Sequence, residues 1–193
     1  MRNIFVAVLL LALSGCAAPP PKMSRAEYLD AVQRSYEGKS SEDVFAAAEK
    51  VLTLMDGDDF TFHHSADSVT GMRSWLVFAL LIVVDGVDTW TIKAVDTPTG
   101  TNATVSVATS TASAIAAPTG GAGVSSSDSG ATPGQVSGTA LYDLFWARMD
   151  YMLGTRSDWM TCDQAKTKLA AGETTGNLLQ ICDGITIKDE SPE

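Results

Sequence analysis

Apolar residues at helical spacing mark two consecutive segments after residue 23, and both are predicted to be helices. Ser24-Arg25-Ala26-Glu27 has the sequence of a capping box, in which the Ser oxygen and the Glu carboxylate bind free N–H groups of the first turn. This helix is predicted to reach about Glu37 and to end at Gly38. The second helix is predicted to begin at Ser40 or Ser41. Its buried stripe is expected to contain Val44, Ala47, Ala48, Val51, Leu52 and Met55.

Alternating and continuous apolar runs then replace the helical spacing and predict strands. Phe60-Thr61-Phe62 alternates over a short strand. Trp75 to Val84 is a run of ten apolar residues, which is too short to cross a bilayer as a helix, because that needs about 20 apolar residues. The Val and Ile content of this run, and the Asp85-Gly86 pair that follows it, favour a buried strand that enters a tight hairpin at Asp85-Gly86.

The hairpin is expected to continue into a meander. Val87 to Val95 is predicted to be the return strand, and Ala103 to Thr109 a further strand. The inward residues of these two strands are expected to be Trp90, Ile92, Ala94, Val105 and Val107. Because an exposed apolar sheet face would promote aggregation, helices are expected to cover it. The predicted fold class is therefore α+β, with an antiparallel β-meander of three to four strands packed on amphipathic helices.

Residues 110–138 break this pattern, because they are almost entirely Ser, Thr, Ala, Gly and Pro, with Asp128 as their only charge. Such a stretch has too few apolar residues to offset the entropy lost when it is ordered. It is expected to be a long flexible insertion within the domain. The alternative is a surface segment that becomes ordered on a partner.

Order is expected to return at Thr139, the predicted N-cap of a strongly apolar helix that ends at Gly154. Its apolar residues are Leu141, Leu144, Phe145, Tyr151 and Met152. A short helix from about Asp163 to Ala171 should follow. Leu178 to Ile187 is predicted to be a final strand or an extended tail.

The first residues of the chain have the pattern of a secretory signal peptide. Arg2 precedes an unbroken apolar run from Ile4 to Leu13, and small residues follow it. Leu13-Ser14-Gly15-Cys16 resembles the lipobox of bacterial lipoproteins. The resemblance implies that residues 1–15 are removed as a lipoprotein signal peptide and that Cys16 is the lipidation site, which carries diacylglycerol and an acyl chain such as palmitate. The alternative is an ordinary secreted protein with an unrelated Cys at its cleavage site.

The residues after Cys16 indicate the membrane to which the protein is delivered. Ala17 stands where an Asp tends to retain lipoproteins in the inner membrane, so the resemblance implies transport to the cell outer membrane, with the protein facing the periplasm. Residues 16–23 are expected to form a lipidated Pro-rich tether, because proline runs favour extended spacers. Residues 24–193 are expected to form a single α+β domain that contains the flexible loop 110–138.

The net charge of the chain limits the classes of binding partner that we expect. There are 13 Lys and Arg against 23 Asp and Glu, for a formal net charge of −10, and loss of Arg2 with the leader makes the mature chain still more acidic. This balance argues against nucleic acid, which attracts basic surfaces, and against broad contact with anionic head groups. The partners that we expect are the membrane, through the lipid on Cys16, and another envelope protein.

Two cysteines remain once Cys16 is assigned to lipid. An exported protein matures in an oxidising compartment, where the pair Cys162 and Cys182 is most simply a disulfide bond. A metal site would need further ligands, and no His lies near either Cys in the sequence. A metal site and a free thiol pair stay open as alternatives.

Candidate chemistry is sparse. No GxGxxG, GxxxxGK[ST], HExxH or GxSxG pattern occurs, so no catalytic residue, cofactor or metal is predicted. His63 and His64 are adjacent, and adjacent residues of a strand face opposite sides, so an enzyme that uses either one is kept only as an alternative. Trp75 and Trp90 are expected in the core; the alternative is that they line a groove for an apolar or aromatic small ligand.

The order helix, strand meander, long loop, helix resembles the helix-grip modules of BamC-like envelope lipoproteins. The resemblance rests on Arg34-Ser35-Tyr36, Val44 to Leu52, Phe60-Thr61-Phe62 and Trp90-Thr91-Ile92. It implies a non-catalytic component of an outer-membrane assembly. The sequence thus predicts a lipid-anchored binding or scaffolding module that is not an enzyme.

Overall fold

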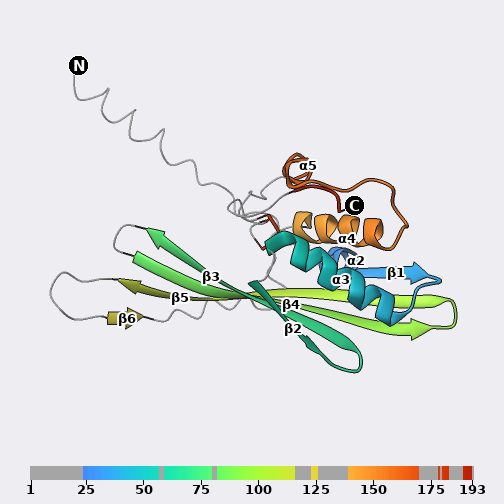
Figure 1. The fold of residues 1–193 in the computed structure, drawn as a ribbon, viewed down its shortest axis with the longest axis horizontal. Coiled ribbons are helices and arrows are strands. Elements are labelled where there is room, and N and C mark those ends of the chain that lie inside the picture. The colour runs from blue at the N-terminus through green and yellow to red at the C-terminus, as the bar shows by residue number, and fades with distance from the viewer. Residues whose placement is uncertain are drawn as a thin grey trace, which may run out of the picture.

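The computed structural model describes residues 24–56, 59–79, 82–115, 123–125, 139–169, 178, 180–182 and 189–192. The fold is α+β, as predicted, with helices packed on one face of an antiparallel sheet (Figure 1). The elements are α2 (Arg25–Val32), β1 (Gln33–Glu37), α3 (Ser41–Asp56), β2 (Phe60–His64), β3 (Ser68–Ala79), β4 (Ile82–Thr97), β5 (Gly100–Ile115), β6 (Gly123–Ser125), α4 (Ala140–Met152) and α5 (Cys162–Lys166).

The sheet is larger than the predicted three to four strands. Its order is β1-β5-β4-β3-β2, and β6 pairs with the far end of β5. The additional strands are β1 and β6. Gln33 of β1 pairs with Thr104, which is distant in sequence, whereas Gly123 of β6 pairs with nearby Ile115.

The first predicted helix is wrong in its second half. Its capping box is present, because Glu27 N–H donates to Ser24 Oγ and Ser24 N–H to the Glu27 carboxylate. The helix nevertheless ends at Val32, and Gln33–Glu37 forms β1 on the edge of the sheet. Pairing with β5 supplies the hydrogen bonds that a longer helix would have made within itself. Gly38, which has a φ of 67°, turns the chain from β1 toward α3.

The second predicted helix is confirmed. Asp43 N–H donates to Ser40 Oγ, and the Asp43 carboxylate accepts from Ser40 N–H. Two backbone N–H groups at the start of α3 are therefore satisfied. Its predicted stripe is fully placed in the core, which contains Val44, Ala47, Ala48, Val51, Leu52 and Met55. The helix lies across β2 to β5 and contacts α4 on its other side.

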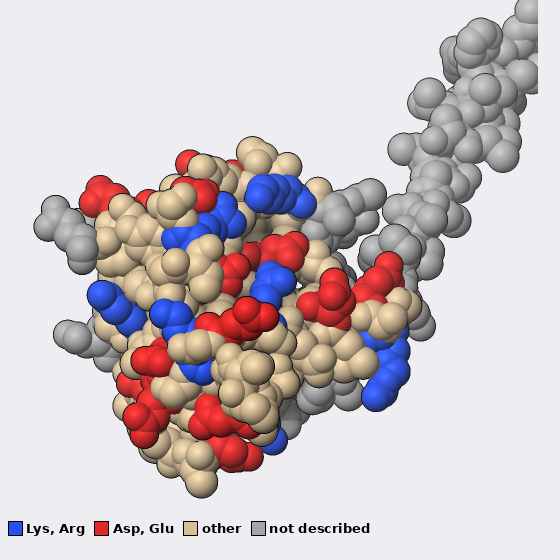
Figure 2. Space-filling view, turned by 90° about the vertical axis from the view of Figure 1, so that its right-hand side faces the viewer, with Lys and Arg blue, Asp and Glu red and all other residues tan. Residues whose placement is uncertain are grey.

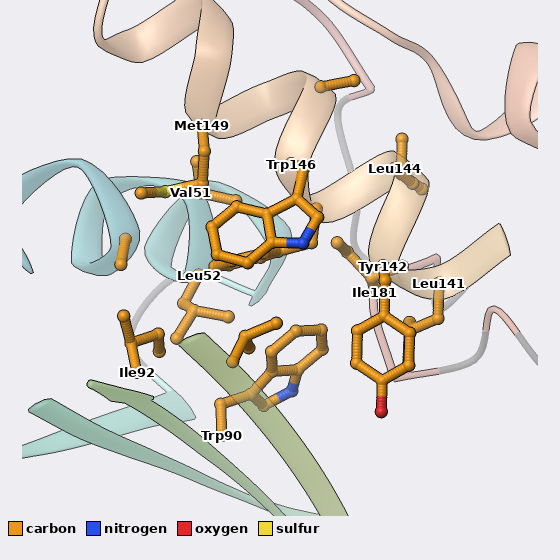
Figure 3. Packing of buried hydrophobic residues seen from close by; sticks show 14 of the residues in the cluster. Val51, Leu52, Trp90, Ile92, Leu141, Tyr142, Leu144, Trp146, Met149 and Ile181 are labelled. Atoms are coloured by element: carbon orange, nitrogen blue, oxygen red, sulfur yellow. The ribbon is translucent and has the colours of Figure 1, made fainter. Parts of the chain in front are cut away.

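The main core lies between these helices and the sheet (Figure 3). Trp90 and Ile92 of β4 are buried as predicted, and the ring of Trp90 packs 5.2 Å from that of Phe145. Trp146 donates its indole N–H to the carbonyl of Ala31 at 2.8 Å, which ties α4 to the end of α2. Burial raises the pKa of the Tyr36 phenol in this core, and the Asp150 carboxylate adds to the shift.

The C-terminal region is joined to α5 by a disulfide bond and to α4 by an ion pair. Cys162 and Cys182 are bonded, with an S–S distance of 2.10 Å, so the predicted pairing is present. Arg148 is 1% exposed; it donates to Asp189 Oδ1 at 2.7 Å and to the Met160 carbonyl. Burial lowers the pKa of the Arg148 guanidinium to about 10, and Asp189 opposes the shift.

The ends of the other predicted elements also change. Residues 110–115, expected in the flexible insertion, continue β5, and 123–125 form β6. The rest of the predicted insertion, the signal peptide 1–15 and the tether 16–23 lie outside the described residues. The last helix covers Cys162–Lys166 and so stops short of Ala171. Within the described part of the chain, no helix is long and apolar enough to cross a membrane.

Candidate functional site

The sheet extends well beyond the helices that cover it. In Figure 1, β3, β4 and β5 run out from beneath α3 and α4 as a long projection. We call this projection the distal arm: it contains Ser74–Ala79 of β3, Ile82–Val87 of β4, residues 110–115 of β5, and β6. The rest of the sheet is called the covered half. The arm is the candidate interaction site, because the described residues that face solvent there include large apolar side chains.

A buried polar cluster marks the boundary between the two parts. Arg73 and Asp88 pair across β3 and β4, and each is 2% exposed. Arg73 Nη2 lies 2.9 Å from Asp88 Oδ2, and Thr109 Oγ1 donates to Asp88 Oδ1 at 2.6 Å. The guanidinium also lies 5.9 Å from the centre of the Phe60 ring. Opposite charges with a further hydrogen bond compensate each other where both are buried.

One step further out, Trp75 lies over Gly86. The two residues are paired across β3 and β4, and a Cβ added to Gly86 would come within 2.3 Å of the indole ring. A glycine in a strand interior often marks such a close approach. Trp75 is thereby half-buried, and it directly precedes the exposed residues Leu76 and Val77 on β3.

Leu76 and Val77 follow and are exposed, at 53% and 51%. As neighbours on a strand they lie on opposite faces of the sheet, so each face carries one exposed apolar side chain at this point, and exposed Asp85 lies opposite Leu76. The register pairs Val77 with Val84 and Ala79 with Ile82. Only residues 80 and 81 separate β3 from β4, and both are leucines in the sequence.

This arrangement corrects the prediction for Trp75 to Val84. The run is divided between two paired strands, the hairpin does not turn at Asp85-Gly86, and both of those residues lie inside β4. The buried position that we expected is replaced by exposure at Leu76 and Val77. The Asp-Gly signal was misleading because Gly86 serves to admit the ring of Trp75.

The opposite end of the sheet has a different surface. There β4 and β5 are joined by a turn at residues 98 and 99, and Figure 2 shows acidic and basic side chains mixed over that end of the molecule. Val95 is 62% exposed near this end of β4. It is a single apolar residue between charged neighbours, Lys93 and Asp96 among them.

The other predicted candidates are placed apart from the arm. His63 and His64 are exposed on β2, and His64 Nε2 lies 3.1 Å from Glu49 Oε1. Trp90 shares the inward face of the sheet with Trp75 but is fully buried against Phe145, so it presents no surface to a ligand. Among the tryptophans, only Trp75 is more than marginally exposed.

A shallow groove of about 280 Å³ lies between α3 and the end of α4. Its sides carry Lys39, Asp43 and Lys50, and Met152 and Leu153 are among its apolar residues. The groove is thus polar at its rim and contains no tryptophan. It lies on the covered half of the molecule and is separate from the arm.

The exposed apolar arm and the buried ion pair were both missed from the sequence. A signal for the hairpin was present, however, because Arg73 and Asp88 stand at equal distances from Leu80-Leu81. A hairpin centred on the two leucines brings these opposite charges together. No family model, curated protein or solved structure matches this chain in the comparisons.

Proposed function

We propose that this chain is a lipid-anchored envelope protein that acts as a non-catalytic binding or scaffolding module at the outer membrane, facing the periplasm. The lipobox-like Leu13-Ser14-Gly15-Cys16 supports the anchor, with Cys16 as the lipidated residue. The distal arm supports the binding role, and it is the observation that carries this role. Its partner is another component of the envelope.

Exposed apolar surface on a projecting strand promotes association with other molecules. Scattered apolar residues are normal on protein surfaces, but a contiguous apolar end on a projecting element marks an interaction site or an aggregation hazard. The arm has no charge from Ser74 to Val84. Charged residues are the usual protection of exposed strand ends against unwanted association. Asp85 is the only charged residue of the arm as defined, and this scarcity of charge is consistent with a surface that is covered in the working protein.

The anchor is tested by replacing its residue in the full chain. Cys16→Ser is expected to abolish the lipid mass on the mature protein and to remove the protein from the outer-membrane fraction of Gram-negative cells. Replacement of both Cys162 and Cys182 by Ser is the control, because it should leave the lipid in place. An unchanged mass and an unchanged fraction for Cys16→Ser would contradict the anchor.

The binding role is tested with a photo-crosslinking amino acid at Ser74, which is exposed on β3 at the base of the arm. We expect a reproducible protein adduct in intact cells. The same probe at Val95, exposed near the opposite end of β4, is the matched control. Adducts at position 95 alone would move the binding surface away from the arm, and no adduct at either position would count against a scaffolding role.

A further inference from the structure

The outer edge of β3 in the distal arm has no partner strand among the described strands. β2 pairs with Val69–Arg73 and with no later residue of β3. On the other side of the arm, β6 pairs with the end of β5 and extends the sheet there (Figure 1). Ser74–Ala79 is therefore paired on one side only, with β4. A strand edge of this kind is a template for the addition of a further strand.

The hydrogen bonds at the start of β3 show which residues face this edge. Ala94 N–H donates to the Asp67 carbonyl on the β4 side, and Ser65 N–H donates to the Ser68 carbonyl on the β2 side. In an antiparallel ladder, the N–H and C=O of one residue point to the same side, and successive residues alternate. The register with β4 continues without a bulge from Ser68 to Ala79. Even-numbered residues therefore direct their N–H and C=O groups to the outer edge, and in the arm these are Ser74, Leu76 and Phe78.

This edge lacks the features that usually prevent strand addition. Edge strands are commonly protected by charged residues, proline or a bulge. Ser74–Ala79 contains no charge and no proline, and its pairing with β4 is regular. Each outward residue offers one donor and one acceptor at the repeat of a β-strand. An extended polypeptide segment matches that repeat, because its own backbone groups alternate in the same way.

The side chains beside the edge define the chemistry of the added strand. On one face Trp75 is half-buried and Val77 is exposed, and on the other face exposed Leu76 pairs with exposed Asp85 of β4. A basic side chain directly opposite Leu76 would lay its apolar stem over Leu76 and reach the carboxylate of Asp85, two strand spacings or about 10 Å away. The next residues on either side would place apolar side chains against Trp75 and Val77.

We propose that the open edge of β3 binds an extended segment of the envelope partner as an added antiparallel strand, with an apolar, a basic and an apolar residue opposite Trp75, Leu76 and Val77. The inference rests on the proposed function and names the chemistry of the partner in that binding role. A second copy of the chain does not supply this chemistry from its own edge, because no basic residue occurs from Ser74 to Val84.

The first test measures hydrogen exchange of single backbone amides by NMR in the full-length, processed protein in detergent micelles. The probe is the capped peptide Ser-Thr-Val-Arg-Val-Thr-Ser at millimolar concentration. We expect it to slow the exchange of the Leu76 amide, and of the other outward amides at Ser74 and Phe78, by about tenfold. The amides of Trp75 and Val77 already face β4 and should not change. Slowing at both kinds of position, or at neither, would overturn strand addition.

The charge of Asp85 tests which segment the edge prefers. A peptide with Glu in place of Arg should bind about fivefold more weakly, because the ion pair is exposed to solvent. Asp85→Lys should reverse this preference. Glu37→Lys, an equal change of charge at an exposed position of β1, should leave the preference as it is. Equal affinity of the unmodified protein for both peptides would overturn the basic residue, and slowed exchange at higher protein concentration alone would identify a second copy as the occupant.

Leu76→Pro separates this inference from the proposed function. Proline removes the N–H that faces the edge and leaves the bonds to β4 in place, since the two sides of the strand alternate. With the photo-crosslinking amino acid at Ser74, we expect the protein adduct to be lost in Leu76→Pro, and thermal unfolding checks that this variant retains the fold. An adduct that survives in a folded Leu76→Pro protein would overturn strand addition and leave the scaffolding role standing. If this variant does not fold, the exchange pattern with the peptide decides.

Discussion

The covered half of the sheet and the distal arm are built from the same strands in one continuous register, yet they differ in what their apolar residues do. In the covered half, Ile92 and Val105 point inward and are fully buried beneath helices. In the arm, Leu76 and Val77 are exposed. The comparison shows that the apolar character of a strand does not itself determine burial, because burial also requires an element to lie over it.

The buried polar cluster lies where the covered half of the sheet meets the distal arm. Inside Arg73, Asp88 and Thr109 the helices exclude water, and outside the cluster the strands are held by their own ladder and by Trp75 over Gly86. The two parts should therefore respond differently to the same kind of mutation. Variants that remove equivalent groups from each part measure that difference.

The largest contrast is expected between the two tryptophans of the inward face. Trp90→Ala should lower the free energy of unfolding by about 4 kcal/mol, because it leaves a cavity beneath α4. Trp75→Ala should cost about 1 kcal/mol, because Trp75 is only half-buried. Chemical denaturation of both variants and of the unmodified protein measures these free energies of unfolding. Similar losses for the two variants would mean that the arm is as well packed as the covered half.

The next effect concerns the boundary. Asp88→Ala should cost about 3 kcal/mol, because it leaves the guanidinium of Arg73 buried without its carboxylate. Replacing both partners, as Arg73→Met with Asp88→Leu, should restore most of the loss, since an apolar pair carries no uncompensated charge. Urea unfolding of the single and double variants tests this. A double variant as unstable as Asp88→Ala would show that the cluster contributes more than mutual neutralisation.

How far the sequence predicts this comparison depends on the range of the interactions. The stripe of α3 and the inward residues of β4 were predictable, because helical and strand periodicity are local properties of the chain. The strand Gln33–Glu37 was not, since it depends on pairing with β5, about 70 residues later. Local patterns indicate how a segment alternates, and distant partners determine which state it adopts.

The candidate site was less predictable than the fold for a related reason. An apolar run such as Trp75 to Val84 is typical of a core strand when only the sequence is known, and only the extent of the described helices shows that none of them covers Leu76 and Val77. Because Asp85-Gly86 is typical of a turn, the hairpin turn was predicted several residues too late in the sequence. The symmetric placement of Arg73 and Asp88 was the one local clue to the true bend.

The disulfide bond allows a third comparison, because it links residues outside the distal arm and should stabilise the region around α4 and α5 more than the arm. Replacing Cys162 and Cys182 by Ser should lower the free energy of unfolding by about 3 kcal/mol on the chain-entropy account, for a separation of 20 residues. The tail should become more accessible to protease as Asp189 leaves Arg148. Protease digestion should not become faster within the arm, and faster cleavage there would show that the two parts unfold together.

A smaller effect is expected at the base of the arm. Gly86→Ala places a Cβ where the Trp75 ring lies, so the ring must move, at a cost of about 1 kcal/mol, which is no more than the loss of the ring itself. The same change in a Trp75→Ala background should be close to neutral, because the clash is gone. A double-mutant cycle from denaturation midpoints isolates this contact. No coupling between the two positions would mean that the ring does not rest on Gly86 in solution.

The smallest effect is expected at the end of the arm, and it defines the comparison most sharply. Leu76→Ser with Val77→Ser should change the free energy of unfolding by no more than about 0.5 kcal/mol in solution, because exposed side chains lose little on becoming polar. Val51→Ser in α3, which polarises a fully buried valine, should cost several times more. Calorimetry over a range of protein concentrations measures both. A loss for the arm variant that grows with concentration would show that a second copy covers Leu76 and Val77, whereas a concentration-independent, near-zero change leaves their apolar character to be explained by a surface outside this chain.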